Sequence, residues 1–256
     1  MTYRHISLDR DGPVAAVTLR EGRRRNTLSS SLLGELLDAL RKTGDGDATG
    51  VVLAAEGPVF SAGHDFADLD GRDESSMREL LELCTDVMRA VQALPQVVIA
   101  QVQGLATAAG CQLVATCDLA VAAETARFAV PGGRGGWFCT TPAVALARAV
   151  GRKRALEMLF TGDPIDAPTA AAWGLVNRVV PDEQLAAQTR DLLARATRGS
   201  PRSKATGKQA FYRQVDLDTD AAYELAIAVM AEASQTDEAR EGVRAFLEKR
   251  RAQFPK

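Results

Sequence analysis

Two short, largely apolar runs constrain most strongly what this chain can fold into. They are VVLAA at 51–55 and VVIAQV at 97–102, and a glycine-bearing loop and a helical pattern follow each of them. Strands without polar alternation are typical of sheets that are buried on both faces. Two further strand-like segments follow at 119–124 and 127–130. The chain therefore predicts an α/β fold of repeated strand–strand–helix units.

The segments around these runs show the periodicities of a hairpin and of amphipathic helices. Residues 3–10 and 13–20 alternate apolar and polar positions, which predicts a β-hairpin. Leucines at helical spacing predict a helix over 29–40 that begins with a serine cap. A longer helix over 75–94 should end before Pro95, because proline disfavours helical conformation in the preceding residue.

From Thr140 onward the chain is predicted to be almost wholly helical. We divide it into a core, residues 1–195, and a C-terminal helical section, residues 196–256. The segment DEAREGVRAFLEKRRAQF has apolar residues on one face and charges on the other. Such a section either packs on a partner subunit or covers the chain's own sheet, and the spacing alone favours neither.

Composition excludes several classes of function. A formal net charge of -2 argues against nucleic-acid binding, which needs a clustered basic excess. The longest apolar stretches are too short to span a bilayer, and the charged start is unlike a secretory signal. Four cysteines without CxxC spacing indicate reduced thiols and a cytoplasmic location. With two histidines, no zinc site at standard spacing is visible.

Two loops of small residues are the candidate functional segments. VFSAGHD at 59–65 follows the first apolar strand, and GLATAAGCQL at 104–113 leads into a helix predicted over 109–117. Small residues let the backbone approach a ligand, and the first N–H groups of a helix lack internal partners. Two such loops could form an oxyanion hole. A tight turn and close helix–sheet packing are the structural alternatives.

These loops, with MLFTGDPIDAPTAAAWGLVNRVVP and the terminal AFLEKRRAQF, resemble the crotonase (enoyl-CoA hydratase/isomerase) superfamily over nearly the whole chain. The resemblance implies a crotonase-like ββα spiral core and a homotrimer or homohexamer. It also implies an acyl-CoA thioester as ligand, with coenzyme A entering as part of the substrate and no separate cofactor or metal. The thioester carbonyl would accept hydrogen bonds from the backbone N–H groups of His64 and Ala109, the latter where the family usually has glycine.

The sequence departs from the family pattern at two positions. Where hydratases carry the two glutamates that activate water and deliver a proton, this chain has Gln112 and Gly132. An amide cannot accept a proton from water at neutral pH, and glycine offers no functional group. General acid–base catalysis supplies about 10²–10⁴-fold, so ordinary hydration should be severely impaired.

Other candidate residues surround this predicted site. Arg24 matches the family's contact with the CoA phosphates, although arginine clusters are usually solvated turns. Phe246 and Lys249 match a C-terminal contact with CoA that can cross a subunit boundary. The remaining substrate-binding candidates are Ala62 in the first loop, and Arg134, Trp137 and Cys139 in the segment GGRGGWFCTT. Core packing is an equally good account of the tryptophan and the cysteine.

Three functional hypotheses follow from the sequence. The first is an enzyme of the enoyl-CoA hydratase or isomerase type that stabilises a thioester enolate or oxyanion. The second is a catalytically silent CoA-thioester binder. The third is an acyl-CoA decarboxylase in which Arg134 meets the carboxylate of the acyl group.

Overall fold

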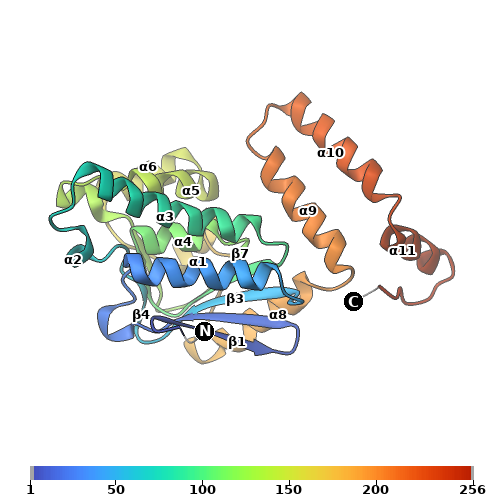
Figure 1. Ribbon diagram of the computed structural model, residues 1–256, viewed down its shortest axis with the longest axis horizontal. Helices are drawn as coiled ribbons and strands as arrows, with labels where there is room; N and C mark the ends of the chain where they lie inside the picture. Colours follow the sequence, from blue (N-terminus) through green and yellow to red (C-terminus); the bar gives the residue numbers. More distant parts are fainter. Residues whose placement is uncertain (1–2, 255–256) are drawn as a thin grey trace.

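The computed structural model describes residues 3–254 and contains two sheets (Figure 1). The larger sheet has six strands in the order β1-β2-β3-β5-β7-β10: β1 Ile6–Asp11, β2 Val14–Leu19, β3 Gly50–Ala55, β5 Val97–Val102, β7 Leu119–Ala123 and β10 Arg178–Val180. The smaller sheet has the order β4-β6-β8-β9: β4 Val59–Ser61, β6 Leu105–Thr107, β8 Arg127–Ala129 and β9 Ile165–Asp166. Apart from the antiparallel pairs β1–β2 and β8–β9, the strands run parallel.

Helices and short 3₁₀ turns connect and cover the strands. The helices of the core are α1 Ser30–Gly44, α2 Phe66–Leu69, α3 Glu74–Ala93, α4 Ala109–Thr116, α5 Thr140–Val150, α6 Arg152–Thr161, α7 Ala167–Trp173 and α8 Leu185–Ala196. The 3₁₀ turns are η1 Gly22–Arg24, η2 Pro131–Gly135 and η3 Asp182–Gln184. The C-terminal helices are α9 Pro201–Gln214, α10 Thr219–Ala233 and α11 Asp237–Leu247.

Three successive units share one plan, which confirms the predicted strand–strand–helix repeat. In each unit one strand joins the larger sheet, the next joins the smaller sheet, and helices follow: β3-β4 with α2 and α3, β5-β6 with α4, and β7-β8 with α5. The antiparallel β1–β2 hairpin is also confirmed. Because equivalent strands neighbour one another in each sheet, the loops that follow them lie side by side.

Helix boundaries follow from local caps. The Ser29 hydroxyl accepts from the N–H of Leu32 and begins α1, which extends to Gly44 rather than ending near residue 40. Asp73 caps α3, and Leu94, the residue before Pro95, is extended at ψ 135°, so this helix ends where proline requires. The expectation of a wholly helical chain after Thr140 is wrong at β9 and β10. These strands have only two and three residues, too few to show a period.

The larger sheet separates two apolar layers. One face packs against α1, α3 and α4, where five leucines of α1 are buried: Leu32, Leu33, Leu36, Leu37 and Leu40. The other face packs on α8 through Leu185 and Leu193, which cluster with Val52, Ile99 and Val121. Since both faces are covered, the central strands carry no polar alternation, as their sequences indicated.

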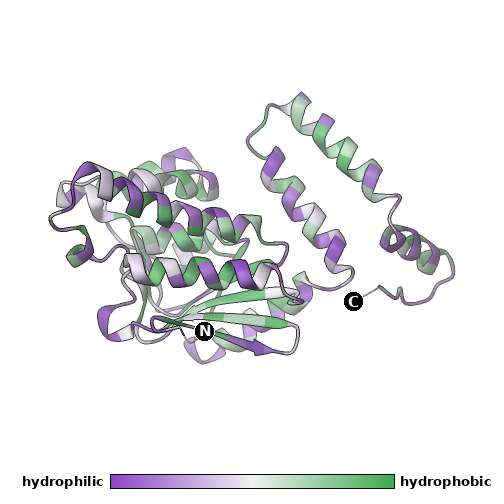
Figure 2. Cartoon of the chain, viewed as in Figure 1, coloured by the Kyte–Doolittle hydropathy of each residue, from purple (hydrophilic) through white to green (hydrophobic). Residues whose placement is uncertain are grey.

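The helices α9–α11 form an arm that extends away from the core (Figure 1). Neither α9 nor α10 contains a buried residue, and α11 contains one, Ala245. Green, hydrophobic segments nevertheless run along α10 (Figure 2), where Ile227 and Met230 are 66% and 79% exposed. The division at 195/196 falls before the last residue of α8 and stays a prediction, and residues 1–2 and 255–256 lie outside the described part.

Within residues 3–254, no helix combines the length and the apolar character needed to cross a membrane.

Candidate active site

The two small-residue loops meet because β4 and β6 are parallel neighbours in the smaller sheet. Gly63, in the first loop, has φ +80°, and a Cβ on it would lie 2.9 Å from the Cβ of Ala108 and 3.2 Å from the Ala109 nitrogen. A Cβ on Gly110 would lie 2.5 Å from the Ser61 carbonyl oxygen. Both glycines are therefore required for the loops to approach this closely.

The orientation of the His64 N–H follows from how the first loop is held. The Gly63 carbonyl accepts a 2.8 Å hydrogen bond from the N–H of Leu28. Because the C=O and N–H of a trans peptide point in opposite directions, the N–H of His64 is directed away from Leu28. The Ser61 hydroxyl donates to the Asn26 carbonyl at 2.8 Å and accepts from the N–H of Gly63 at 3.2 Å. These hydrogen bonds hold the segment that precedes His64.

The Ala109 N–H is oriented by an unusual conformation at Ala108. Ala108 has φ 50° and ψ −120°, a region that non-glycine residues rarely adopt. Its N–H donates to the Ala129 carbonyl at 2.9 Å, and its carbonyl accepts from the N–H of Gln112 at 3.0 Å. The Ala108 carbonyl therefore points into α4, so the Ala109 N–H on the same peptide points out of the helix N-terminus.

These two N–H groups are the candidate donors of the oxyanion hole expected from the sequence. Outside helices and strands, neither the His64 N–H nor the Ala109 N–H donates a backbone hydrogen bond among the described residues. The Gly63 contact places the two loops edge to edge, and the dipole of α4 adds positive potential at Ala109. The arrangement can stabilise negative charge on a bound oxygen.

The His64 side chain contacts the segment that carries Leu28, and its Nε2 atom is buried without a hydrogen-bond partner among the described residues. Its Nδ1 lies 3.4 Å from the Leu28 carbonyl oxygen. Burial lowers the pKa of the imidazole, while the Leu28 carbonyl and Asp68 oppose that shift. A neutral ring can donate from Nδ1 to the carbonyl and so helps to hold the two segments together.

Arg24 lies beside the first loop, and Ala62 lies within it. The Arg24 guanidinium makes a 2.5 Å ion pair with Asp65, whose other oxygen accepts from the N–H of Ala67 and caps α2. The arginine side chain is 57% exposed, so part of it can still reach a ligand from solvent. The Ala62 N–H donates to the Arg25 carbonyl at 3.0 Å, which leaves the Ala62 carbonyl as its free backbone group in these turns.

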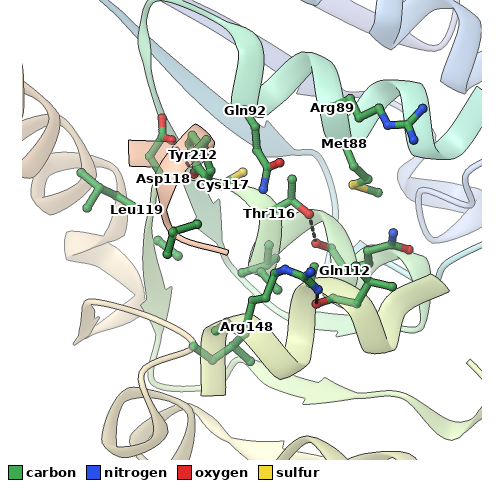
Figure 3. Close-up of a pocket in the computed structure, with 18 of the residues that line it drawn as sticks. Met88, Arg89, Gln92, Gln112, Thr116, Cys117, Asp118, Leu119, Arg148 and Tyr212 are labelled. Atoms are coloured by element: carbon green, nitrogen blue, oxygen red, sulfur yellow. Dashed lines mark hydrogen bonds between the residues drawn. The ribbon is translucent and has the colours of Figure 1, made fainter. Parts of the chain in front are cut away.

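Gln112 lies one helical turn from Ala109 and borders a cavity of about 870 Å³ (Figure 3). The residue is 5% exposed, and its Oε1 atom is buried without a hydrogen-bond partner among the described residues. The Thr116 hydroxyl donates to the backbone carbonyl of Gln112, one turn earlier in α4, at 2.8 Å. Gln112 thus connects α4, whose N-terminus carries the Ala109 N–H, with the wall of this cavity.

Gly132 occupies a position that has no room for a side chain. A Cβ there would lie 2.3 Å from the Trp137 carbonyl oxygen and 2.6 Å from the Cys139 Sγ. The Trp137 N–H donates back to the Gly132 carbonyl at 3.0 Å, so the segment closes into a tight turn. A glutamate at this position would require the whole turn to move.

The other candidate residues of the segment 132–141 differ in how far they are buried. Burial raises the pKa of the Cys139 thiol, which therefore stays protonated at neutral pH and is not an activated nucleophile. Trp137 is 46% exposed, and Phe138 stacks on Phe160 at 5.8 Å near the surface. Arg134 is exposed and pairs with Asp163 at 2.9 Å, so an acyl carboxylate would have to displace that partner.

Phe246 and Lys249 lie in and just after α11, at the far end of the arm from the two loops (Figure 1). Phe246 is 83% exposed, and Lys249 has a left-handed backbone at φ 53°. Within one chain the structure does not bring them to the oxyanion loops.

Sequence reasoning missed two residues that build the site. Asn26 is fully buried at φ 49°, and its amide donates to the carbonyls of Glu56 and Val59 at 2.8 Å, which positions the first loop. Ala108 turns the second donor outward. An asparagine after an arginine run gives a weak turn signal, whereas the alanine gives none. Among residues 3–254, no cluster of three or more His, Cys, Asp or Glu side chains could hold a metal ion.

Comparison with known proteins gives consistent results. A family model described as enoyl-CoA hydratase/isomerase matches residues 9–256. A mouse protein, enoyl-CoA hydratase domain-containing protein 3, mitochondrial, is 45% identical over 237 residues, covering 92% of this chain and 79% of the relative.

Two solved structures have the same fold. The enoyl-CoA hydratase of Mycobacterium smegmatis superposes with a TM-score of 0.95 at 45% identity, with 98% of each chain covered. Human enoyl-CoA hydratase domain-containing protein 3 superposes with a TM-score of 0.94 at 41% identity, covering 98% of this chain and all of the other. The predicted crotonase-like fold is confirmed.

The same comparison corrects one prediction. The mouse relative and its rat, frog and human counterparts are all named as mitochondrial proteins. The cytoplasmic location expected from cysteine usage is therefore contradicted. Reduced cysteines do not distinguish the two compartments.

Proposed function

Because the chain belongs to the enoyl-CoA hydratase/isomerase family, we propose that it binds acyl-CoA thioesters and stabilises an oxyanion or enolate at the thioester carbonyl. The observation that carries this proposal is the pair of outward-directed N–H groups at His64 and Ala109. The two groups belong to loops that approach within van der Waals contact at Gly63 and Ala109.

The two donors act on the charge that develops during reaction. A thioester oxygen gains negative charge when the α-carbon loses a proton or a carboxylate, and also when a nucleophile attacks the carbonyl. Rigid donors need no reorganisation at that moment, and removing one typically costs about 2.7–4 kcal/mol. The network through Leu28, Ser61 and Ala108 supplies this rigidity.

The proton-transfer half of a hydratase is missing from our proposal. Gln112 can hydrogen-bond a ligand but cannot act as a base, and Gly132 is enclosed by Trp137 and Cys139. We therefore expect hydration of crotonyl-CoA to be slower by about 10²–10⁴-fold than in relatives that carry both carboxylates.

The CoA moiety is proposed to bind at Arg24 and the Ala62 backbone, on the exposed side of the oxyanion loop. Phe246 and Lys249 could contribute only from another subunit, since they lie far from this loop within one chain. The exposed apolar residues of the arm support a homotrimer or homohexamer: Tyr223, Ile227, Met230, Phe246 and Leu247.

The first test measures binding and turnover separately. Isothermal titration with butyryl-CoA should give saturable binding, and crotonyl-CoA absorbance should decline far more slowly than with a two-glutamate hydratase assayed alongside. Hydration at the rate of that control would contradict the loss of acid–base catalysis. Absence of thioester binding would overturn the proposal as a whole.

A catalytically silent CoA-thioester binder is the second candidate, and the enclosed Gly132 favours it, because the missing carboxylate cannot be supplied there. A panel of enoyl, malonyl and saturated thioesters separates the two functions. Product from any member supports an enzyme, whereas affinity without product supports a binder.

A further inference from the structure

A buried ionic cluster fastens the C-terminal arm to the core. The Lys208 ammonium on α9 donates to the Val91 carbonyl at 2.9 Å, to the Gln96 carbonyl at 2.8 Å and to Asp118 at 2.7 Å. An ammonium has three N–H donors, so all of them are used. The Tyr212 hydroxyl, one turn further along α9, donates to the other oxygen of Asp118 at 2.8 Å.

The cluster is far more buried than the helix that carries it. The side chains of Lys208 and Asp118 are 8% and 14% exposed, although the other residues of α9 are exposed or only half-buried. Asp118 also accepts from the N–H of Val98 at 2.7 Å, which ties it to β5. Burial lowers the pKa of Lys208 while Asp118 opposes that shift, so the pair is costly to separate.

The same cluster borders the cavity that begins at Gln112. Asp118 and Tyr212 line this cavity of about 870 Å³, and α9 forms one of its walls opposite α3, α4 and α5 (Figure 3). The second link across it is exposed, since Arg148 on α5 and Asp216 after α9 pair at 3.0 Å and are each more than half exposed. The buried cluster is thus the stronger of the two connections.

The position of the cavity suits the acyl chain of a bound thioester. Side chains on a helix lean toward its N-terminus, so Gln112 covers the turn that starts at Ala109, where the carbonyl would bind. A chain leaving that carbonyl past Gln112 enters a space that is lined by charged residues such as Arg89 and Arg148 and by these apolar residues: Met88, Val114, Ala115, Val144, Phe211 and Val215. The last two belong to α9 or the residue just after it.

We propose that Lys208, Asp118 and Tyr212 are positioning residues that set acyl-chain selectivity by holding α9 as the outer wall of this cavity. The inference rests on the proposed binding of acyl-CoA thioesters. It adds that the preference for longer acyl chains depends on the attachment of the arm, although none of the three residues touches the thioester group.

The test compares octanoyl-CoA with acetyl-CoA by isothermal titration of the full chain. Each buried methylene contributes about fourfold in affinity, so wild type should prefer octanoyl-CoA by at least about tenfold. Lys208→Met should reduce this preference at least about fivefold. Lys204→Met is the matched control, since Lys204 is exposed one turn earlier on the same helix, and it should keep the wild-type preference.

Tyr212→Phe provides a second variant that keeps the aromatic ring and removes one hydrogen bond to Asp118, should Lys208→Met fail to fold. It should lower the preference in the same direction by about two- to fivefold. An unchanged octanoyl-to-acetyl ratio in either folded variant would overturn the inference while leaving thioester binding intact. If wild type binds neither thioester, the proposed function itself fails, and this inference fails with it.

Discussion

The two halves of the candidate site are built from different parts of the chain. The oxyanion half consists of backbone groups, held by Leu28, Ser61 and Ala108 through hydrogen bonds of 2.8–3.2 Å. The other half, in our proposal, is formed by Gln112 and the turn at Gly132 and depends on side chains, and the sequence has no carboxylate at either position. Backbone donors tolerate changes of side chain, as alanine at 109 illustrates, whereas side-chain chemistry is lost with one substitution.

Substitution of Gly63 should have the largest effect on stability and thioester binding, because it directly disturbs the backbone half of the site. Gly63→Ala places a Cβ 2.9 Å from the Ala108 Cβ at φ +80°. Strain and overlap each cost about 1–3 kcal/mol, so we expect a loss of about 2–6 kcal/mol in the free energy of unfolding, with loss of thioester binding. Chemical denaturation and titration with butyryl-CoA measure both effects.

Gly71→Ala is the matched control for the backbone strain. Gly71 has φ +74°, but nothing lies within 4 Å of its Cβ position. In Gly71→Ala the free energy of unfolding should fall only by the cost of backbone strain, about 1–3 kcal/mol, and the affinity for thioesters should not change. Equal losses in the two variants would show that the contact between the loops is unimportant.

The second prediction concerns the side-chain half. Gly132→Ala adds one methyl group at 2.3 Å from the Trp137 carbonyl oxygen, which should cost about 1–3 kcal/mol in the free energy of unfolding. Gly135→Ala lies in the same turn with open space around its Cβ and should cost under about 1 kcal/mol. A Gly132→Ala protein as stable as the Gly135→Ala protein would mean that a glutamate could be accommodated there.

A smaller effect is expected when one support of the oxyanion loop is removed. Ser61→Ala deletes the hydroxyl that donates to the Asn26 carbonyl and accepts from the N–H of Gly63. Leaving buried groups unpaired costs about 1–3 kcal/mol. We expect the free energy of unfolding to fall by about 1 kcal/mol, the lower end of this range, because the Leu28 hydrogen bond remains. The affinity for butyryl-CoA should decrease modestly. Stability equal to wild type would show that this support is redundant.

The sequence predicted the fold well where patterns were long. The apolar runs at 51–55 and 97–102, the five leucines of α1 and the proline after α3 each imposed a strong local preference. The short strands β9 and β10 were not predicted, because two or three residues are too few to show a periodic pattern. They are fixed instead by pairing with β8 and β7.

The candidate site was less predictable for a physical reason. Its donors are backbone groups, so the small residues of the two loops showed where they lie but not how they are oriented. The orientation comes from hydrogen bonds to Leu28 and from the rare backbone conformation of Ala108, both set by tertiary contacts. The enclosure of Gly132 by Trp137 and Cys139 likewise could not be inferred from spacing.

The smallest predicted effect is the pH dependence that His64 gives to the oxyanion half. Its folded-state pKa lies below the ordinary value of 6.5, mainly because of burial. The unfolded chain therefore binds the proton more readily, so the stability contribution is present above about pH 6.5 and is lost as the pH falls. The slope cannot exceed about 1.4 kcal/mol per pH unit for one proton.

His64→Gln keeps the backbone donor while it removes this titration, and so it separates the side chain from the oxyanion hole. Denaturation curves between pH 5 and 8 should show less loss of stability at low pH in His64→Gln than in wild type. His5→Gln, which removes the chain's other histidine, should retain the contribution of His64. If His64→Gln follows the wild-type curve, the imidazole is not held neutral against the Leu28 carbonyl, and the rigidity of this loop rests on its backbone hydrogen bonds alone.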